Sequence, residues 1–335
     1  MERQDKEITI TDVAKQAGVS MATVSRVVNG NSNVKAETRK KVMAVIDKLN
    51  YHPNAVARSL ASKKSTTIGV IIPNMVDLLY SNLAKGIDDV ATMYKYNIIL
   101  TSIQKGLSSD KQLLDGLIAK QVDGIIYMGE KVSPDLHEEM INSRIPIVFA
   151  GAIDEQNKIS SVNIDYINAV KDVVGKLAEK GNEKIALVTG SLNDPVNGKY
   201  RLKGYKEALS AAHLDYDENN VFEGQYTLAS GANIWKQIKA RGITAAYVPN
   251  DLLGIGVLNA ALDDGVKVPD DFEIVTGNNT VMCSITRPQI SSVSQPLYDI
   301  GAVAMRMLTK LMNGEKLDYE AIKLPYNLIK RGTTK

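Results

Sequence analysis

The chain has 335 residues, of which 44% are hydrophobic and 23% are charged. This length predicts two or three domains, and the composition is typical of a soluble globular protein with a large core. No apolar run approaches the ~18 residues of a membrane span, and the N-terminus lacks a signal-peptide core. The single cysteine excludes an intramolecular disulfide, and three scattered histidines argue against a metal site. We therefore expect a cytoplasmic protein without a bound metal.

Basic charge is concentrated at the N-terminus. Residues 1–64 contain 12 Lys and Arg against 6 Asp and Glu, a net charge of +6. The rest of the chain contains 28 basic and 32 acidic residues, a net charge of −4, which gives +2 overall. Such a basic segment is what neutralisation of nucleic-acid phosphates requires.

The segment ITITDVAKQAGVSMATVSRVVNG, residues 8–30, has the pattern of a helix-turn-helix. Thr11 is predicted to cap a first helix, with Asp12 in its first turn, and Gly18 to end that helix. Ser20 is predicted to cap a second helix that runs from Met21 to about Val28.

The second helix has the two faces that a DNA recognition helix needs. Val24, Val27 and Val28 can face the first helix and the core. The opposite face comprises Ala22, Ser25, Arg26 and Asn29. Its small side chains allow close approach to the floor of a DNA groove, and the Arg26 guanidinium can bond the edge of a guanine. The alternative is a small amphipathic helix pair with one solvated arginine.

The rest of the N-terminal region predicts a third helix over 34–50, stopped by Pro53. The following residues, NAVARSLASKK, could form only a short helix that is marginal in isolation, and we interpret them as a hinge.

From Ser65 onward, short apolar runs alternate with amphipathic segments, which predicts parallel, doubly wound sheets. The number of strands favours two α/β lobes with a ligand crevice at the strand C-termini. A last helix, Asp299–Met312, could cross back to the first lobe. The predicted strands are Thr67–Ile72, Ile98–Thr101, Gly124–Tyr127, Ile147–Ala150, Ile185–Thr189, Ala245–Val248 and Glu273–Val275, with an extended Ile290–Gln295. The predicted helices between them are Tyr80–Tyr94, Lys111–Lys120, Ile167–Lys180, Arg201–Ala212, Ala229–Ala240 and Leu252–Asp264.

The predicted fold class is thus an N-terminal all-α helix-turn-helix headgroup followed by an α/β core of two doubly wound parallel-sheet lobes. The expected domains are a headgroup over 1–53, a hinge helix over 54–65 and a core over 66–335. Within the core we expect an N-lobe of about 66–163 and 294–325, and a C-lobe of about 164–293 and 326–335.

Several motifs carry a family resemblance. They are DVAKQAGVSMATVSRVVNG, PNAVARSLASKK, GVIIPN, the segment Arg201-Leu202-Lys203-Gly204-Tyr205, Asn250-Asp251 and ITRPQISSVSQPLYDIG. Along essentially its whole length the chain resembles the lactose repressor family. The resemblance implies a dimeric, sequence-specific DNA-binding repressor that is not an enzyme, with a core similar to periplasmic sugar-binding proteins. In agreement, the sequence lacks a GxGxxG, P-loop or GxSxG motif and metal-ligand spacing.

The resemblance also implies which residues contact DNA. Met21, Ala22 and Arg26 would read bases in the major groove, and Leu60 would be a wedge in the minor groove at the centre of a pseudo-palindromic operator. For Leu60, simple packing between domains is the alternative. The remaining implied contacts, several of them to the phosphate backbone, are Ser20, Thr23, Ser25, Asn29, Tyr51 and Asn54.

In sugar-responsive relatives an arginine, an asparagine and an aspartate bind the effector in the crevice. Arg201 and Asn250 match the first two positions, but Asn278 stands where the family usually has the aspartate. Loss of that carboxylate weakens the case for a neutral sugar and leaves a phosphorylated sugar open. Arg201 could instead brace a helix.

Further blocks, among them ATMYKYNIIL and YDIGAVAMRMLTK, resemble family members that take the serine-phosphorylated phosphocarrier protein HPr as corepressor in carbon catabolite repression. Arg306 would then contact the phosphoserine. The implied corepressor-binding residues are Tyr94, Tyr298, Asp299, Val303, Arg306 and Lys310. An ordinary solvated helix face is one alternative. The alternative function is a repressor of a sugar-utilisation operon that responds to a sugar or sugar phosphate.

Overall fold

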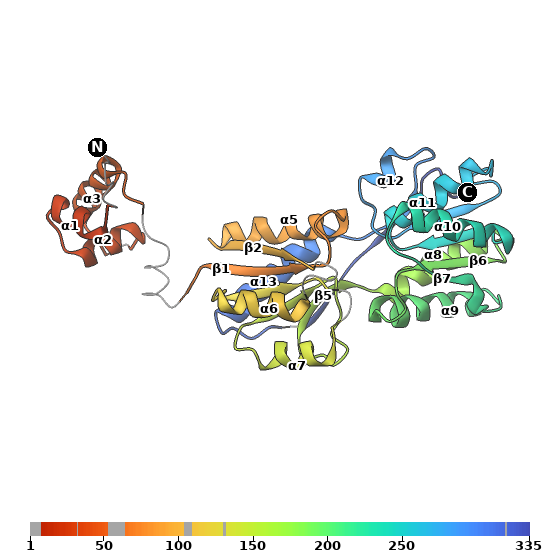
Figure 1. The fold of residues 1–335 in the computed structure, drawn as a ribbon, viewed down its shortest axis with the longest axis horizontal. Coiled ribbons are helices and arrows are strands. Elements are labelled where there is room, and N and C mark those ends of the chain that lie inside the picture. Colours follow the sequence, from red (N-terminus) through yellow and green to blue (C-terminus); the bar gives the residue numbers. More distant parts are fainter. Residues whose placement is uncertain (1–7, 32, 53–63, 104–108, 130–131, 319) are drawn as a thin grey trace. The chain divides into compact units, whose positions relative to one another are not determined.

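The structure is a computed structural model, and it describes residues 8–31, 33–52, 64–103, 109–129, 132–318 and 320–335. The chain divides into two compact units, Met1–Ser65 and Thr66–Lys335 (Figure 1). The described residues include no helix that is long and apolar enough to cross a membrane.

The described part of the first unit is helical and consists of α1 (Ile10–Ala17), α2 (Met21–Val28) and α3 (Ala36–Leu49). The predicted cap at Thr11 is wrong, because α1 begins one residue before it and is capped by Thr9. The Asp12 carboxylate accepts hydrogen bonds from the Thr9 backbone N–H at 2.9 Å and from the Thr9 hydroxyl at 2.8 Å. Gly18 ends α1 in the left-handed region, at φ 63°.

The start of α2 is as predicted: the Ser20 hydroxyl accepts from the Thr23 backbone N–H at 3.2 Å. Val24 and Val27 are buried, and Val28 is half-buried, so this face of α2 packs on the other two helices. The buried residues of this small core are Val13, Ala14, Ala17, Val24, Val27, Val42 and Tyr51.

Within its described residues, the second unit contains two six-stranded sheets, one for each lobe. The first has the order β11-β5-β4-β3-β1-β2, with every neighbouring pair parallel. Its strands are β1 (Thr67–Ile72), β2 (Asn97–Ser102), β3 (Gly124–Tyr127), β4 (Ile147–Ala150), β5 (Ser160–Ile164) and β11 (Ala321–Leu324).

The second sheet has the order β12-β10-β9-β8-β6-β7 and is parallel except for β12 at its edge, which is antiparallel to β10. Its strands are β6 (Ile185–Thr189), β7 (Val221–Glu223), β8 (Ala245–Val248), β9 (Glu273–Thr276), β10 (Ser291–Ser294) and β12 (Asn327–Ile329). The predicted two-lobed α/β architecture is confirmed.

The helices connect the strands in each lobe. The first lobe has α5 (Leu78–Met93), α6 (Asp110–Ala119) and α7 (Pro134–Asn142). The second has α8 (Tyr166–Glu179), the π-helical turn η1 (Val196–Arg201), α9 (Leu202–Ala211), a 3₁₀ turn η2 (Glu218–Asn220), α10 (Leu228–Ala240), α11 (Asp251–Asp263) and α12 (Met282–Ile285).

The last helix, α13 (Leu297–Met312), returns to the first lobe as predicted and packs on α5, β3, β4 and β5. Glycines allow the close approach of α13 and α5, because a Cβ on Gly86 would lie 2.0 Å from the Tyr298 carbonyl oxygen. This packing places one side of α13 in the core and leaves its other side on the surface.

Candidate functional sites

The exposed face of α2 carries the residues predicted to read DNA. Met21 is 53% exposed, and Ala22, Arg26 and Asn29 are also exposed, while Thr23 and Ser25 are half-buried. The Asn29 amide donates to the Ser25 hydroxyl at 3.3 Å. Among the described residues Arg26 has no ion-pair partner, so its guanidinium is available to a ligand.

The other predicted DNA contacts lie outside helix α2. Ser20 caps α2 and is exposed, whereas Tyr51 is only 9% exposed and belongs to the headgroup core. Asn54 and Leu60 lie outside the described residues.

Arg39 is a residue that the sequence analysis missed. It lies half-buried in α3, and its guanidinium donates to the Val27 carbonyl at 3.5 Å and to the Asn31 carbonyl at 2.5 Å. The Val27 carbonyl also accepts from the Gly30 backbone N–H at 3.1 Å, so Arg39 adds a second donor at the end of α2 and holds the segment that follows. The basic run in α3 gave no reason to separate Arg39 from its neighbours.

We expect Arg39→Met to weaken specific DNA binding by about tenfold, the equivalent of about 1.4 kcal/mol, because the end of α2, the predicted recognition helix, loses its anchor. The exposed neighbour Lys40 provides the matched control, since Lys40→Met removes the same charge. Fluorescence anisotropy with operator and random DNA measures both variants. Equal losses for the two variants on both DNAs would show that Arg39 acts only as a charge.

In the second unit, Arg201, Asn250 and Asn278 line one cavity of about 50 Å³ between the two lobes. Asn250 follows β8 and Asn278 follows β9, so they come from the strand C-termini, where ligands of doubly wound sheets bind. Arg201 is the last residue of η1. The sequence analysis assigned all three to the effector cleft, and the structure brings them together.

Arg201 is held by a polar network inside this cleft. Its Nη1 donates to Asn197 Oδ1 at 2.6 Å, and its guanidinium carbon lies 5.3 Å from the centre of the Tyr166 ring. The Nε atom of Arg201 is buried and has no hydrogen-bond partner among the described residues. A buried guanidinium N–H without a partner is costly, so the cleft retains capacity to bind an anion or a hydroxyl.

Asn197, a second residue that the sequence analysis missed, organises this network. It is fully buried, accepts from the Thr189 hydroxyl at 2.8 Å and donates its amide to Asp194 at 3.2 Å and to the Tyr226 hydroxyl at 3.1 Å. Burial raises the pKa of the nearby Tyr166 hydroxyl to about 12, so it stays protonated. Only the π-helical turn reveals the role of Asn197, and the sequence pattern contains no signal for it.

Asn278 is buried and already paired within the protein. Gln295 Nε2 lies 3.1 Å from its side-chain oxygen, and the Asn278 backbone N–H donates to the Asp251 carboxylate at 3.2 Å. This position therefore presents an occupied amide rather than the carboxylate that sugar-responsive relatives use, in agreement with the sequence argument.

A contact between the lobes involves the cleft residue Asn250. Asp77 caps α5 by accepting from the Leu79 N–H at 2.9 Å, and its other oxygen lies 3.4 Å from the amide nitrogen of Asn250, the cap of α11. Burial raises the pKa of the Asp77 carboxyl above its usual range, and hydrogen bonds from Leu79 and Asn250 oppose that rise only in part.

Asp77→Asn is expected to stabilise the protein at pH 7 by a few tenths to about 1 kcal/mol, because an amide keeps the cap without the cost of a buried charge. Since the folded pKa is raised, the wild type loses stability as the pH rises through the window between the unfolded and folded values. Urea unfolding from pH 4 to 7 should show a difference between variant and wild type that grows with pH. A constant difference would contradict this assignment.

The predicted corepressor residues of α13 lie on its exposed side. Tyr298 is 45% exposed, Asp299, Arg306 and Lys310 are exposed, and Val303 is half-buried. The Tyr298 hydroxyl donates to Asp89 of α5 at 3.2 Å, and Lys310 lies 3.5 Å from Asp318. Tyr94, at the end of α5, is 48% exposed. In the described structure Arg306 forms no ion pair, so it can accept an anionic partner.

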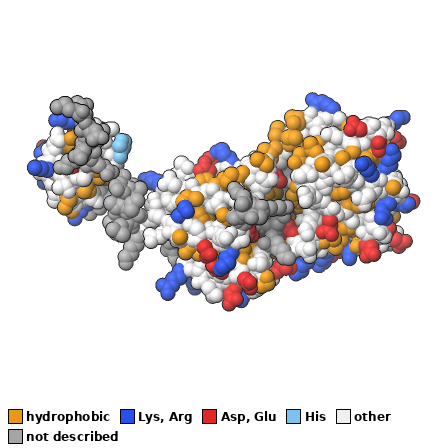
Figure 2. All heavy atoms as spheres, in the orientation of Figure 1, with side chains coloured by type: hydrophobic (Ala, Val, Ile, Leu, Met, Phe, Trp, Pro, Cys, Tyr) orange, Lys and Arg blue, Asp and Glu red, His pale blue; other side chains and the backbone are white. Residues whose placement is uncertain are grey.

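A second surface of this unit is apolar. Val76 and Leu252 line one hollow of about 200 Å³ together with Met282 of α12. Figure 2 shows hydrophobic side chains gathered along the upper edge of the unit, where Figure 1 places α12. The exposed members of this apolar face are Met75 (49%), Val76 (84%), Leu252 (38%), Val281 (64%) and Ile285 (61%). Clustered exposed apolar side chains of this kind are typical of a surface that contacts another chain.

Comparisons with known proteins agree with this architecture. Residues 9–54 match the family model of bacterial regulatory proteins of the lacI family, and residues 174–334 match a periplasmic binding protein-like domain. Catabolite control protein A of Streptococcus mutans is 53% identical over 331 residues, 99% of both chains. The HTH-type transcriptional regulator pepR1 of Lactobacillus delbrueckii is 46% identical over 334 residues, 100% of this chain and 99% of that protein.

Solved structures lead to the same family. The transcription regulator CcpA of Lactococcus lactis superposes with a TM-score of 0.77 at 43% identity, over 80% of this chain and 99% of that one. The lac repressor dimer bound to operator and an anti-inducer superposes with a TM-score of 0.88 at 30% identity, over 98% and 99% of the two chains. The chain therefore belongs to the lacI family of bacterial regulatory proteins, as a DNA-binding transcriptional regulator similar over its whole length to catabolite control protein A.

Proposed function

We propose that this regulator binds a pseudo-palindromic operator as a homodimer and takes serine-phosphorylated HPr as corepressor in carbon catabolite control. The observation that carries the proposal is the exposed side of α13, where Arg306 has no ion-pair partner in the described structure and is flanked by Val303 and Lys310. An arginine binds a phosphoserine with two parallel charge-assisted hydrogen bonds, and the half-buried valine supplies apolar contact beside it.

In this proposal α2 enters the major groove. Arg26 reads a guanine, Met21 and Ala22 contact neighbouring base edges, and Thr23, Ser25 and Asn29 position the phosphate backbone. Ser20 and Tyr51 support the same docking, with Tyr51 acting from the headgroup core. Asn54 and Leu60, which lie outside the described residues, complete the predicted contacts, with Leu60 as the wedge in the minor groove.

A pseudo-palindromic operator requires two copies of the chain related by a two-fold axis. We assign the contact between these copies to the apolar face around α12. In an isologous dimer each copy would cover the same face of its partner, which removes both apolar surfaces from water.

Val281→Glu is expected to raise the dimer dissociation constant at least tenfold, because Val281 is 64% exposed in the chain and the variant would bury a carboxylate in an apolar contact. Sedimentation equilibrium measures the change. Ile141→Glu is the matched control, since Ile141 is 39% exposed on α7, away from α12. Unchanged self-association of the Val281 variant would contradict the assignment of this face.

A second candidate function is a response to a sugar phosphate in the cleft, and the buried Arg201 Nε without a partner favours it. The cavity of about 50 Å³ holds little more than water, so binding would require the lobes to move apart. Asn278, held by Gln295, offers no carboxylate that would repel a phosphate.

One titration separates the two functions. Operator binding is measured by fluorescence anisotropy in the presence of HPr, serine-phosphorylated HPr, or glucose 6-phosphate alone. Enhancement by the phosphoprotein alone supports the proposed function. An effect of the sugar phosphate alone, with no response to the phosphoprotein, supports the alternative.

A further inference from the structure

A larger pocket lies between α8 and the sheet of the second lobe. It has a volume of about 310 Å³, compared with about 50 Å³ for the cleft cavity. Its walls come from the C-terminal half of α8, from β9, β10 and β12, and from the last residues of the chain. From the lining residues and their charges, we propose that this pocket binds a small anion with an apolar body, such as a medium-chain carboxylate.

The floor of the pocket is apolar. Val173 and Leu177 project from α8, and Leu328 and Ile329 belong to the edge strand β12, while Val275 comes from β9. Val173, Leu177 and Val275 are buried, and the two β12 side chains are half-buried. Apolar walls of this kind favour an aliphatic or aromatic group, because burying that group against them removes apolar surface from water.

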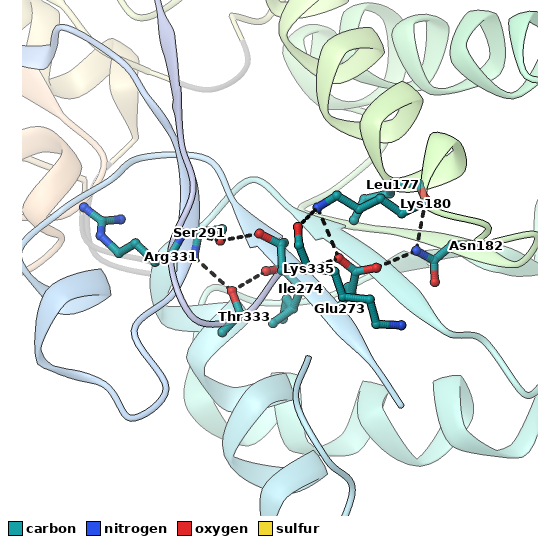
Figure 3. Close-up of polar contacts among 10 residues, drawn as sticks. Leu177, Lys180, Asn182, Glu273, Ile274, Ser291, Arg331, Thr333 and Lys335 are labelled. Carbon is teal, nitrogen blue, oxygen red and sulfur yellow. Dashed lines mark hydrogen bonds and ion pairs between the residues drawn. The ribbon is translucent and has the colours of Figure 1, made fainter. Parts of the chain in front are cut away.

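A network of buried polar contacts fixes the wall formed by the end of the chain (Figure 3). The Thr333 hydroxyl donates to the Ile274 carbonyl at 2.7 Å and accepts from the Ser291 backbone N–H at 2.9 Å. Glu273, which is fully buried, accepts from the Asn182 amide at 2.8 Å and from the Lys335 backbone N–H at 2.9 Å. The wall is therefore preformed, and a ligand need not order it.

The rim of the pocket is basic. Four lysines and one acidic side chain line it: Lys176, Lys180, Lys330 and Lys335, with Glu179. The Lys180 ammonium group already has partners within the protein, since it donates to the Lys335 carbonyl and lies 3.5 Å from the Glu273 carboxylate (Figure 3). Within the described residues no carboxylate lies within ion-pairing distance of Lys176 or Lys330. Two available ammonium groups above an apolar floor match a ligand with one anionic head and an apolar body.

The pocket sits where it could influence the cleft. It borders β9 at Val275 and the beginning of β10 at Ser291, and the same two strands end next to Asn278 and Gln295 in the cleft. The binding proposal does not depend on corepressor or operator, so its test is separate from that of the proposed function.

The test is isothermal titration of the full-length protein with octanoate, with 1-octanol as the neutral ligand of similar length. We expect octanoate to bind at least tenfold more tightly than octanol, and the double variant Lys176→Gln/Lys330→Gln to lose at least tenfold in octanoate affinity. The double variant Lys171→Gln/Lys236→Gln is the matched control, since it removes the same charge outside the pocket. No octanoate binding up to several millimolar, or equal losses in the two double variants, would overturn the proposal.

Discussion

Arg26→Ala is expected to weaken binding to the specific operator by roughly 10- to 100-fold, about 1–3 kcal/mol, and to relax the preference at one base position. The physical reason is that α2 exposes a guanidinium without an ion-pair partner in the described structure, on the side opposite buried Val24 and Val27. A guanine edge offers two acceptors to such a fork, and alanine offers no donor in return. Anisotropy titrations against operators with each base substituted measure both effects.

Two controls separate base reading from charge. Arg26→Lys keeps the charge but loses the fork, so it should retain non-specific binding and lose most of the specific gain. Lys40→Ala, on the exposed side of α3, should weaken binding to all DNA sequences uniformly. It should also reduce the slope of log binding constant against log salt concentration by at most about one. If Arg26→Ala leaves the base preference unchanged, α2 is not the reading helix.

Arg306→Ala is expected to reduce the affinity for serine-phosphorylated HPr by roughly 10- to 100-fold, because a bidentate bond between charged groups contributes about 1.5–3 kcal/mol. The variant should bind operator alone as the wild type does, since Arg306 lies exposed on α13 in the second unit. The enhancement of operator binding by the phosphoprotein should then disappear at concentrations that saturate the wild type.

The nearby charged residue Lys310 serves as a comparison. Lys310→Ala also removes a positive charge, but Lys310 lies 3.5 Å from Asp318 and offers a single point charge, so a smaller loss is expected. If Arg306→Ala and Lys310→Ala both leave phosphoprotein binding intact, the exposed side of α13 is an ordinary solvated helix face.

The sequence predicted the helices of the headgroup and the repeated α/β pattern because both depend on local periodicity. The cap of α1 was misplaced because Thr9 and Thr11 are both suitable caps, and only the position of Asp12 three residues after Thr9 distinguishes them. Strand β5, with the sequence SSVNI, was missed because its polar residues become buried only between β4 and β11. The three-residue β7 and the edge strand β12 are too short to give a pattern of their own.

The residues of the candidate sites also fall into those that the sequence predicts and those that only the tertiary structure reveals. Arg201, Asn250 and Asn278 were predicted from family motifs, and the fold places them on one cavity. Asn197, Gln295 and Arg39 were not predicted, because each acts by bonding a group distant in sequence or a carbonyl at a helix end. Such roles depend on tertiary structure: Gln295 lies within the family motif ITRPQISSVSQPLYDIG, but the motif does not show which group its amide bonds.

The most direct measurement of the central claim is the operator dissociation constant of the full-length protein with saturating serine-phosphorylated HPr and with unphosphorylated HPr. We predict that the phosphorylated form alone tightens operator binding by at least tenfold, and that Arg306→Ala removes this effect while basal binding persists. Equal operator affinity with the two forms of HPr would contradict the account and would shift the search for the control signal to Arg201 and the cleft.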